Sequence, residues 1–235
     1  MESLEPAQAA RPLTEHEGLS ACIMSGIGIP TREKREVSKI QEASLRDLHP
    51  TQLTVGMIVV QDKKKHLEAL SPADRQNFLK AHPMPAVIGP QGTLYITDHH
   101  HLGRAAFDAK ATSAFFLVEA DLSKCTPEAF WKEMNENQWV HPLDENGVRH
   151  YYAAIPDRLN KLVDDIYRSL AGYVRDAGGF EKTPTAFAEF IWADFFRRNV
   201  PIETVRSDFQ TAVRAGLSLA QSKWAKHIPG FNGKS

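Results

Sequence analysis

The sequence predicts an α+β protein in which a small mixed sheet with helices is followed by a helical subdomain. Two observations predict this class. Up to about residue 140, short β-forming runs alternate with helix-like segments, whereas the apolar residues of 155–225 follow helical periodicity only. The 235 residues suffice for one domain with an appended subdomain. We therefore expect an irregular N-terminal arm at 1–35, an α+β domain at 36–140 and a helical subdomain at 141–235.

The first half of the α+β domain contains signals for a strand, a helical turn and two helices. Residues 37–40 are rich in β-forming side chains, and 44–48 form one helical turn that a proline stops. The apolar spacing of 55–70 predicts a helix with a lysine run on its solvent side. The next helix is expected at 72–82, with Ser71 as its cap and a proline at its first position.

A hairpin, a helix and a further strand complete the domain. The apolar runs 85–88 and 93–97 flank a Gly/Pro turn, which predicts a β-hairpin. The alanine-rich segment 102–110 reads as a helix, and the nearly continuous apolar run 113–119 predicts a strand that is buried on both faces. Thr126 precedes a proline and is expected to cap another helix.

Three helices are expected in the second half. They span 155–177, which a Gly-Gly pair ends, then 183–199, and then 201–222. The aromatic side chains of the middle helix are expected in its buried face rather than as a platform for nucleobases: Phe187, Phe190, Trp192, Phe195 and Phe196.

Composition narrows the function classes. Hydrophobic residues make up 42% and charged residues 24%, which is typical of a soluble globular protein. The formal net charge of -1 disfavours a nucleic-acid partner, which usually needs a basic surface. Cys22 and Cys125 show no metal or redox spacing, and the chain has neither a secretory signal nor an apolar run long enough to span a bilayer. A reduced, cytoplasmic setting with no membrane partner is the simplest expectation.

The junction between the second hairpin strand and its helix is the strongest functional signal. Asp98, His99, His100 and His101 stand there, with Arg104 one turn further on. The first turn of a helix exposes unpaired N–H groups and a positive dipole end, which suit phosphate or another anion. Asp98 is expected to cap the helix, and the imidazole and guanidinium groups add donors. A histidine tract at a metal site and a solvated turn without chemistry remain the alternatives.

Several segments together resemble the ParB/sulfiredoxin fold and the ParB-like nuclease family. The hairpin, the box at 98–101, and the following helix and strand are similar to a ParB-like domain, as is the leading segment 45–52. The helical segments 164–171 and 189–197 resemble the second half of the nuclease family, so that the resemblance covers about 36–231. It implies that the box cradles the phosphates of a nucleotide. The box lacks the cysteine that sulfiredoxins need, and the near-neutral charge departs from the DNA-partitioning members.

The resemblance implies a nucleotide-binding enzyme that performs phosphoryl transfer or nucleotide hydrolysis on a small-molecule substrate, with ATP or ADP and Mg²⁺ as cofactors. Related kinases use an acidic base near the start of the domain, where this chain has Gln52; Glu42 or Asp47 are substitutes. The expected catalytic residues are Asp98, His99, His100 and Gln52. The expected phosphate-binding residues are His100, His101, Arg104 and Lys64.

Two residues of the helical half complete the expected site. Tyr167 and Arg168 are candidates for substrate binding in the cleft between the halves, although Asp164 and Arg168 at i,i+4 would also suit a simple ion pair. Asp98 is the expected ligand of a metal ion. Two other functions stay open: a metal-dependent ParB-like nuclease, and a non-catalytic module that binds nucleotide or partitions DNA.

Overall fold

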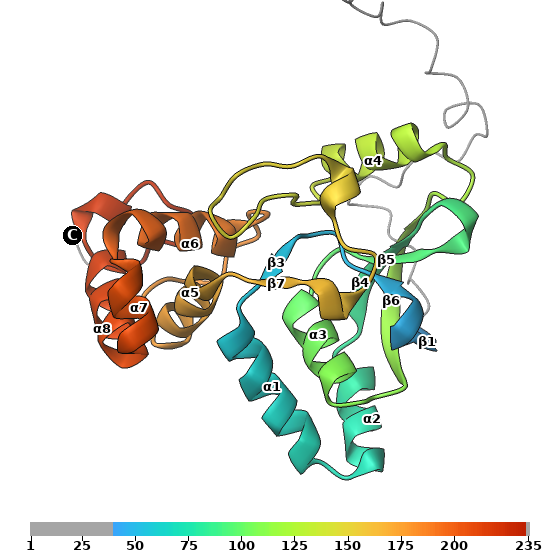
Figure 1. The fold of residues 1–235 in the computed structure, drawn as a ribbon, viewed down its shortest axis with the longest axis horizontal. Coiled ribbons are helices and arrows are strands. Elements are labelled where there is room, and N and C mark those ends of the chain that lie inside the picture. Colours follow the sequence, from blue (N-terminus) through green and yellow to red (C-terminus); the bar gives the residue numbers. More distant parts are fainter. Residues whose placement is uncertain (1–39, 234–235) are drawn as a thin grey trace, which may run out of the picture.

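A computed structural model describes residues 40–233 of the chain. The arm expected at 1–35 and most of the strand expected at 37–40 lie outside the described residues. A sheet with flanking helices forms one half of the molecule, and a helical bundle forms the other (Figure 1). No helix in the described part of the chain is long and apolar enough to cross a membrane.

The sheet is mixed and has five strands. They are β1 (Ile40–Ser44), β2 (Leu48–His49), β4 (Met84–Ile88), β5 (Leu94–Ile96) and β6 (Ser113–Asp121), in the order β1-β6-β4-β5-β2. The antiparallel pairing of β4 with β5 confirms the predicted hairpin. The central strand β4 pairs in parallel with β6, and β1 closes the edge antiparallel to β6. The α+β class is therefore confirmed.

Helices cover both faces of this sheet. On one face α3 (His100–Asp108) packs against α1 (Met57–Ala69), and α2 (Pro72–Ala81) lies near β6 (Figure 1). Ala86 belongs to the core on this face, whereas its neighbour Val87 belongs to the core under α4 (Pro127–Glu136), because alternate strand residues point to opposite faces. The caps predicted at Ser71 and Thr126 form: Ser71 Oγ accepts from Asp74 N–H, and Thr126 Oγ1 accepts from Ala129 N–H.

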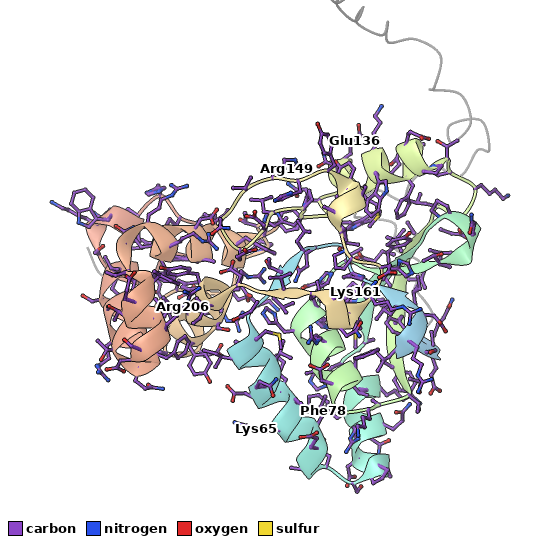
Figure 2. All side chains as sticks on the ribbon, viewed as in Figure 1. Lys65, Phe78, Glu136, Arg149, Lys161 and Arg206 are labelled. Atoms are coloured by element: carbon purple, nitrogen blue, oxygen red, sulfur yellow. The ribbon has the colours of Figure 1, made fainter. Side chains whose placement is uncertain are left out.

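The lysine run of α1 lies on the solvent side of the helix, as predicted. Lys65, labelled in Figure 2, is 76% exposed in its side chain and pairs only loosely with Asp62 at 4.0 Å. Lys64 pairs with Glu68 one turn on, at 3.7 Å. These are surface ion pairs of the kind that contributes little to stability.

The helical half consists of α5 (Ile166–Asp176), α6 (Ala188–Asn199), α7 (Ile202–Ser207) and α8 (Phe209–Ala220). Its core contains Trp192 and Phe196, which are fully buried as expected, with Phe195 packed against them. Phe187 and Phe190 were expected in the same buried face, but they lie outside this core and line a cavity instead. The third expected helix is interrupted at Asp208, whose carboxylate caps α8 by accepting from Thr211 N–H.

The helix expected to start at 155 is the main correction to the predicted elements. The chain instead makes two 3-10 turns, Tyr152–Ala154 and Leu159–Lys161, and then the strand β7 (Val163–Asp164) before α5 begins. β7 pairs in parallel with β3 (Thr54–Val55), and this two-stranded ladder ties the two halves together. The Asp165 side chain caps α5 by accepting from Tyr167 N–H, which sets the late start of the helix.

Candidate functional site

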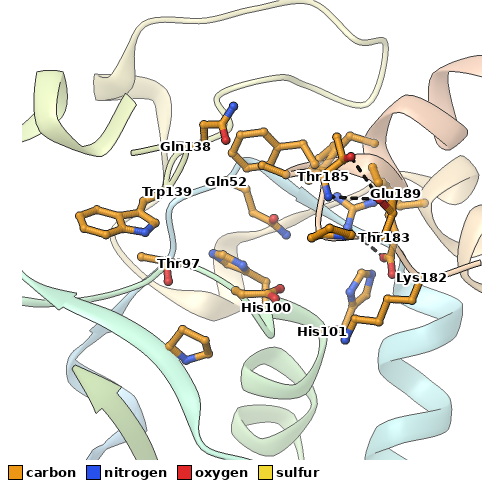
Figure 3. A pocket seen from close by; sticks show the side chains of 18 of the residues that line it. Gln52, Thr97, His100, His101, Gln138, Trp139, Lys182, Thr183, Thr185 and Glu189 are labelled. Carbon is orange, nitrogen blue, oxygen red and sulfur yellow. Dashed lines mark hydrogen bonds and ion pairs between the residues drawn. The ribbon is translucent and has the colours of Figure 1, made fainter. Parts of the chain in front are cut away.

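A cavity of about 420 Å³ lies between the two halves of the molecule (Figure 3). The first turns of α3 and α6 both line it, and α5 and the loop before α6 close its other sides. Each first turn leaves N–H groups without a partner inside the helix and carries the positive end of a helix dipole. The side chains that give the cavity its chemistry are Gln52, Asp98, His100, His101, Glu119, Gln138, Trp139, Arg168, Arg175, Lys182, Thr183, Thr185 and Glu189.

Two histidines of the box are fixed by backbone donors of the loop before α1. Nε2 of His100 accepts from Thr51 N–H at 3.0 Å, and Nε2 of His101 accepts from Gly56 N–H at 3.0 Å. Because a neutral imidazole carries one proton, these bonds put that proton on Nδ1 of each ring. Burial lowers the pKa of His100 to about 3 and the pKa of His101 well below its ordinary value. Both rings are therefore neutral hydrogen-bond donors at physiological pH.

The Thr51 hydroxyl adds a hydrogen bond close to the His100 ring. It donates to the carbonyl of Ile96 at 2.8 Å, and Thr51 is 1% exposed. The loop before α1 is thus joined both to the end of β5 and to the first residue of α3. This arrangement fixes the position of the His100 ring before any ligand arrives.

Arg168 is the most unusual charge in the described part of the molecule. Its side chain is 5% exposed and lines the cavity, yet Nε and Nη1 have no hydrogen-bond partner among the described residues. Its nearest carboxylate oxygen belongs to Glu189, 3.7 Å from Nη2. The guanidinium lies over the ring of Phe190 at 3.5 Å, and burial lowers the pKa of Arg168 to about 10. A buried cation with so few partners is costly to keep, which points to an anionic ligand.

Behind Arg168, the Phe190 ring has a second partner. The ring of His141 lies 3.8 Å from the ring of Phe190, and Nε2 of His141 is buried without a partner in the described chain. Burial lowers the pKa of His141 to about 3, so this ring is also neutral. Phe190 therefore contacts both a neutral imidazole and the guanidinium of Arg168.

The remaining residues of the box differ from expectation. Asp98 lines the cavity, but it does not cap α3: its Oδ1 accepts from His99 N–H at 2.6 Å, and His99 itself is the N-cap residue. His99 adopts a left-handed backbone conformation with φ of 62°, which turns it away from its two neighbours, and its Nδ1 is buried without a described partner. His99 is not among the residues that line the cavity.

Gln52 lines the cavity and is 5% exposed, with its amide nitrogen donating to Thr54 O at 2.7 Å. Arg104 instead bonds Asp108 and the carbonyls of Leu159 and Leu162, so it joins α3 to the turn before β7 and does not line the cavity. Its position one turn into α3 carries it away from the helix start.

Three further residues named in the sequence analysis lie outside the cavity: Lys64, Tyr167 and Asp164. Lys64 stays on the outer face of α1, outside the cavity. Tyr167 is 5% exposed, and its hydroxyl donates to Val200 O at 2.8 Å within the helical half. Asp164 accepts from Met57 N–H at 2.8 Å, so the alternative ion pair with Arg168 does not form.

Sequence reasoning missed Arg175 and the residues that the loop before α6 brings to the box. Arg175 and Glu189 form an ion pair at the cavity wall, and Lys182, Thr183 and Thr185 come from the loop before α6. None of them stands in a motif with the histidines, since about eighty residues separate them in the sequence. Arg168 was predicted from the expectation that the cleft between the two halves binds substrate, and it does line the cavity.

The donor set of the cavity does not resemble a metal centre. No three His, Cys, Asp or Glu side chains in the described chain are arranged to hold a metal ion. Nε2 of both His100 and His101 already accepts a backbone hydrogen bond. Asp98 therefore offers a carboxylate without a set of further protein ligands around it.

Comparisons with known proteins agree with this fold. The model of the family described as "Putative ParB-like nuclease" matches residues 41–198. The crystal structure of protein Atu1540 from Agrobacterium tumefaciens is similar at 32% sequence identity with a TM-score of 0.77, over 84% of this chain and 100% of that chain. No match was found among curated proteins. The resemblance noted in the sequence is confirmed, and this chain belongs to the ParB-like nuclease family.

Proposed function

We propose that this chain is a nucleotide-binding enzyme whose cavity holds a phosphate group of the nucleotide and supports its transfer or hydrolysis. The observation that carries the proposal is Arg168, a guanidinium with 5% side-chain exposure, two unpartnered nitrogens and a carboxylate no nearer than 3.7 Å. Arginine suits phosphate because its planar fork matches two phosphate oxygens. A bound phosphate would supply the missing acceptors.

The other donors of the cavity support the same ligand. The Nδ1–H groups of His100 and His101 and the unpaired N–H groups at the start of α3 are neutral donors. Donors that are fixed in advance stabilise charge that develops on a transferring phosphoryl group without reorganisation during the reaction. The low pKa of His100, about 3, favours a role as donor over a role as proton shuttle.

The size of the cavity favours a small-molecule or mononucleotide substrate. Its volume of about 420 Å³ is within the range of small-molecule sites. Asp98 and Gln52 are the candidates for handling the acceptor hydroxyl or water, Asp98 as a proton acceptor and Gln52 through its amide. ATP or ADP is the proposed nucleotide. Because residues 40–233 supply no metal cage, Mg²⁺ would enter with the nucleotide phosphates, and we assign it no step.

A thermal-shift panel tests this function. We expect ATP, ADP or pyrophosphate to raise the melting temperature of the wild type, because a ligand that binds only the folded state stabilises it. The shift should disappear in Arg168→Gln and decrease in His100→Ala. Lys64→Ala, outside the cavity, should respond like the wild type. Equal shifts in all four proteins, or no shift with any of the three ligands, would overturn the proposal. Release of phosphate or transfer of label then measures turnover.

The family description favours nuclease activity as a second candidate. A nuclease should release short nucleotides from single-stranded or duplex DNA, and its DNA binding should weaken steeply as salt rises. The net charge of -1 argues for a weak salt dependence instead. DNA cleavage that Arg168→Gln abolishes would favour the nuclease over the small-molecule enzyme.

A further inference from the structure

Glu189 lies between the two arginines of the cavity. It belongs to the first turn of α6, and its Oε1 pairs with Nη1 of Arg175 while its Oε2 lies 3.7 Å from Nη2 of Arg168. One carboxylate thus spans both guanidinium groups at the cavity wall, and Figure 3 labels Glu189 there. A phosphate that bridges the two arginines would have to take over this position.

The two arginines use this carboxylate unequally. Arg175 is well partnered, since its Nη2 also bonds Oδ1 of Asp176 at 2.9 Å. Arg168 is not: its distance to Glu189 exceeds a hydrogen bond, and Nε and Nη1 remain unpartnered among the described residues. Glu189 therefore balances part of the charge of Arg168 without satisfying its donors. An incoming anion would therefore find most of its free hydrogen-bond donors at Arg168.

We propose that Glu189 is a tethered counter-ion that sets the charge a ligand must carry, so that the cavity selects phosphate dianions and pyrophosphate over singly charged anions such as carboxylates. The inference rests on the proposed function, because it concerns the same anion site. A monoanion only exchanges one negative charge for another, and it competes with a carboxylate that the chain holds in place at high effective concentration. A dianion or pyrophosphate brings more charge than it displaces and is attracted more strongly by both arginines.

Isothermal titration calorimetry on the full chain tests the proposal with three probes: acetate, inorganic phosphate and pyrophosphate, at pH 7.5 and constant ionic strength. For the wild type we expect pyrophosphate to bind most tightly, phosphate more weakly and acetate not at all. Glu189→Gln should bind phosphate about tenfold more tightly, and its binding of acetate should become measurable. Glu181→Gln is the matched control, since Glu181 also lines the cavity but forms no ion pair with either arginine among the described residues, and it should bind like the wild type.

A second variant covers the case in which Glu189→Gln does not fold, as judged by circular dichroism. Glu189→Asp keeps the charge, but its shorter side chain reaches only one arginine, so a smaller tightening in the same direction is expected. The role of Glu189 would be overturned if the folded Glu189 variants bound phosphate as tightly as the wild type or more weakly. The proposed function would still stand in that case, provided that replacing Arg168 abolishes the binding seen in the wild type. Absence of phosphate and pyrophosphate binding in every protein would overturn both.

Discussion

Replacing Arg168 by methionine should make the ligand-free protein more stable and abolish anion binding. Methionine keeps an unbranched apolar stem against Phe190 and removes the buried charge. Glu189, left behind, still pairs with Arg175. The substitution therefore separates two effects of the cation: its destabilisation of the ligand-free fold and its contribution to anion binding.

The size of the effect follows from the burial of Arg168. Its pKa falls from 12.5 to about 10, and each pKa unit corresponds to about 1.36 kcal/mol, so the fold disfavours the charged side chain by about 3 kcal/mol. Loss of the contact with the Phe190 ring offsets about 1 kcal/mol. We expect a net gain of about 2 kcal/mol in the free energy of unfolding, or roughly 4–8 °C in melting temperature for a chain of this size.

Differential scanning calorimetry in a phosphate-free buffer, with and without pyrophosphate, measures both effects. Without ligand, Arg168→Met should melt above the wild type. With pyrophosphate at about a hundredfold excess over its Kd, the wild type should gain about 2.7 kcal/mol and become the more stable of the two. A ligand-free variant less stable than the wild type, or an undiminished response to pyrophosphate, would refute the argument that Arg168 awaits an anion.

Three further predictions concern the scaffold of the site. Burial lowers the pKa of His100 and of His141 to about 3, below the unfolded value of 6.5, so the unfolded chain binds more protons than the folded chain between these two pH values. The contribution of these two rings to the free energy of unfolding is therefore fully retained above pH 6.5. It falls as pH drops toward 3, by up to about 2.7 kcal/mol per pH unit for the two rings together. Urea unfolding at a series of pH values should show a slope of this sign, and His141→Phe should lower it by up to about 1.36 kcal/mol per pH unit. An unchanged slope would contradict the burial of a neutral ring. Gly56→Ala should lower the free energy of unfolding by about 1–3 kcal/mol in the same assay, because the added Cβ would lie 2.5 Å from the backbone nitrogen of Ser169. A variant as stable as the wild type would mean that α1 and α5 are not in such close contact. Arg104→Ala should lower stability by about 1–2 kcal/mol and leave pyrophosphate affinity unchanged in calorimetric titration, whereas lost affinity would mean that Arg104 reaches the anion.

Local signals in the sequence were sufficient for most of the α+β half. Ser71 and Thr126 each precede a proline at the first helical position, and both helices begin where these signals predict. The region from 155 to 165 was misread because Leu159 and Leu162 have a spacing that suits a helix but pack instead into the core beside α3. The pairing of β3 with β7 joins segments more than a hundred residues apart, which no local pattern reveals.

The candidate site was predictable only where one segment contained it. The junction at His100 and His101 has free helix N–H groups, and both residues line the cavity. Arg168 was found together with Tyr167, but adjacent helix residues point about 100° apart, so one faces the cavity and the other the helical core. Glu189 reaches the cavity that His100 and His101 line through the packing of α6 against α5, which the sequence does not encode locally.

A crystal structure of the protein grown with pyrophosphate tests the central claim most directly. The account predicts a pyrophosphate phosphoryl group within hydrogen-bond distance of the Arg168 guanidinium and of Nδ1 of His100 or His101, at the start of α3. Pyrophosphate bound elsewhere, with the Arg168 nitrogens still unpartnered in the cavity, would contradict it.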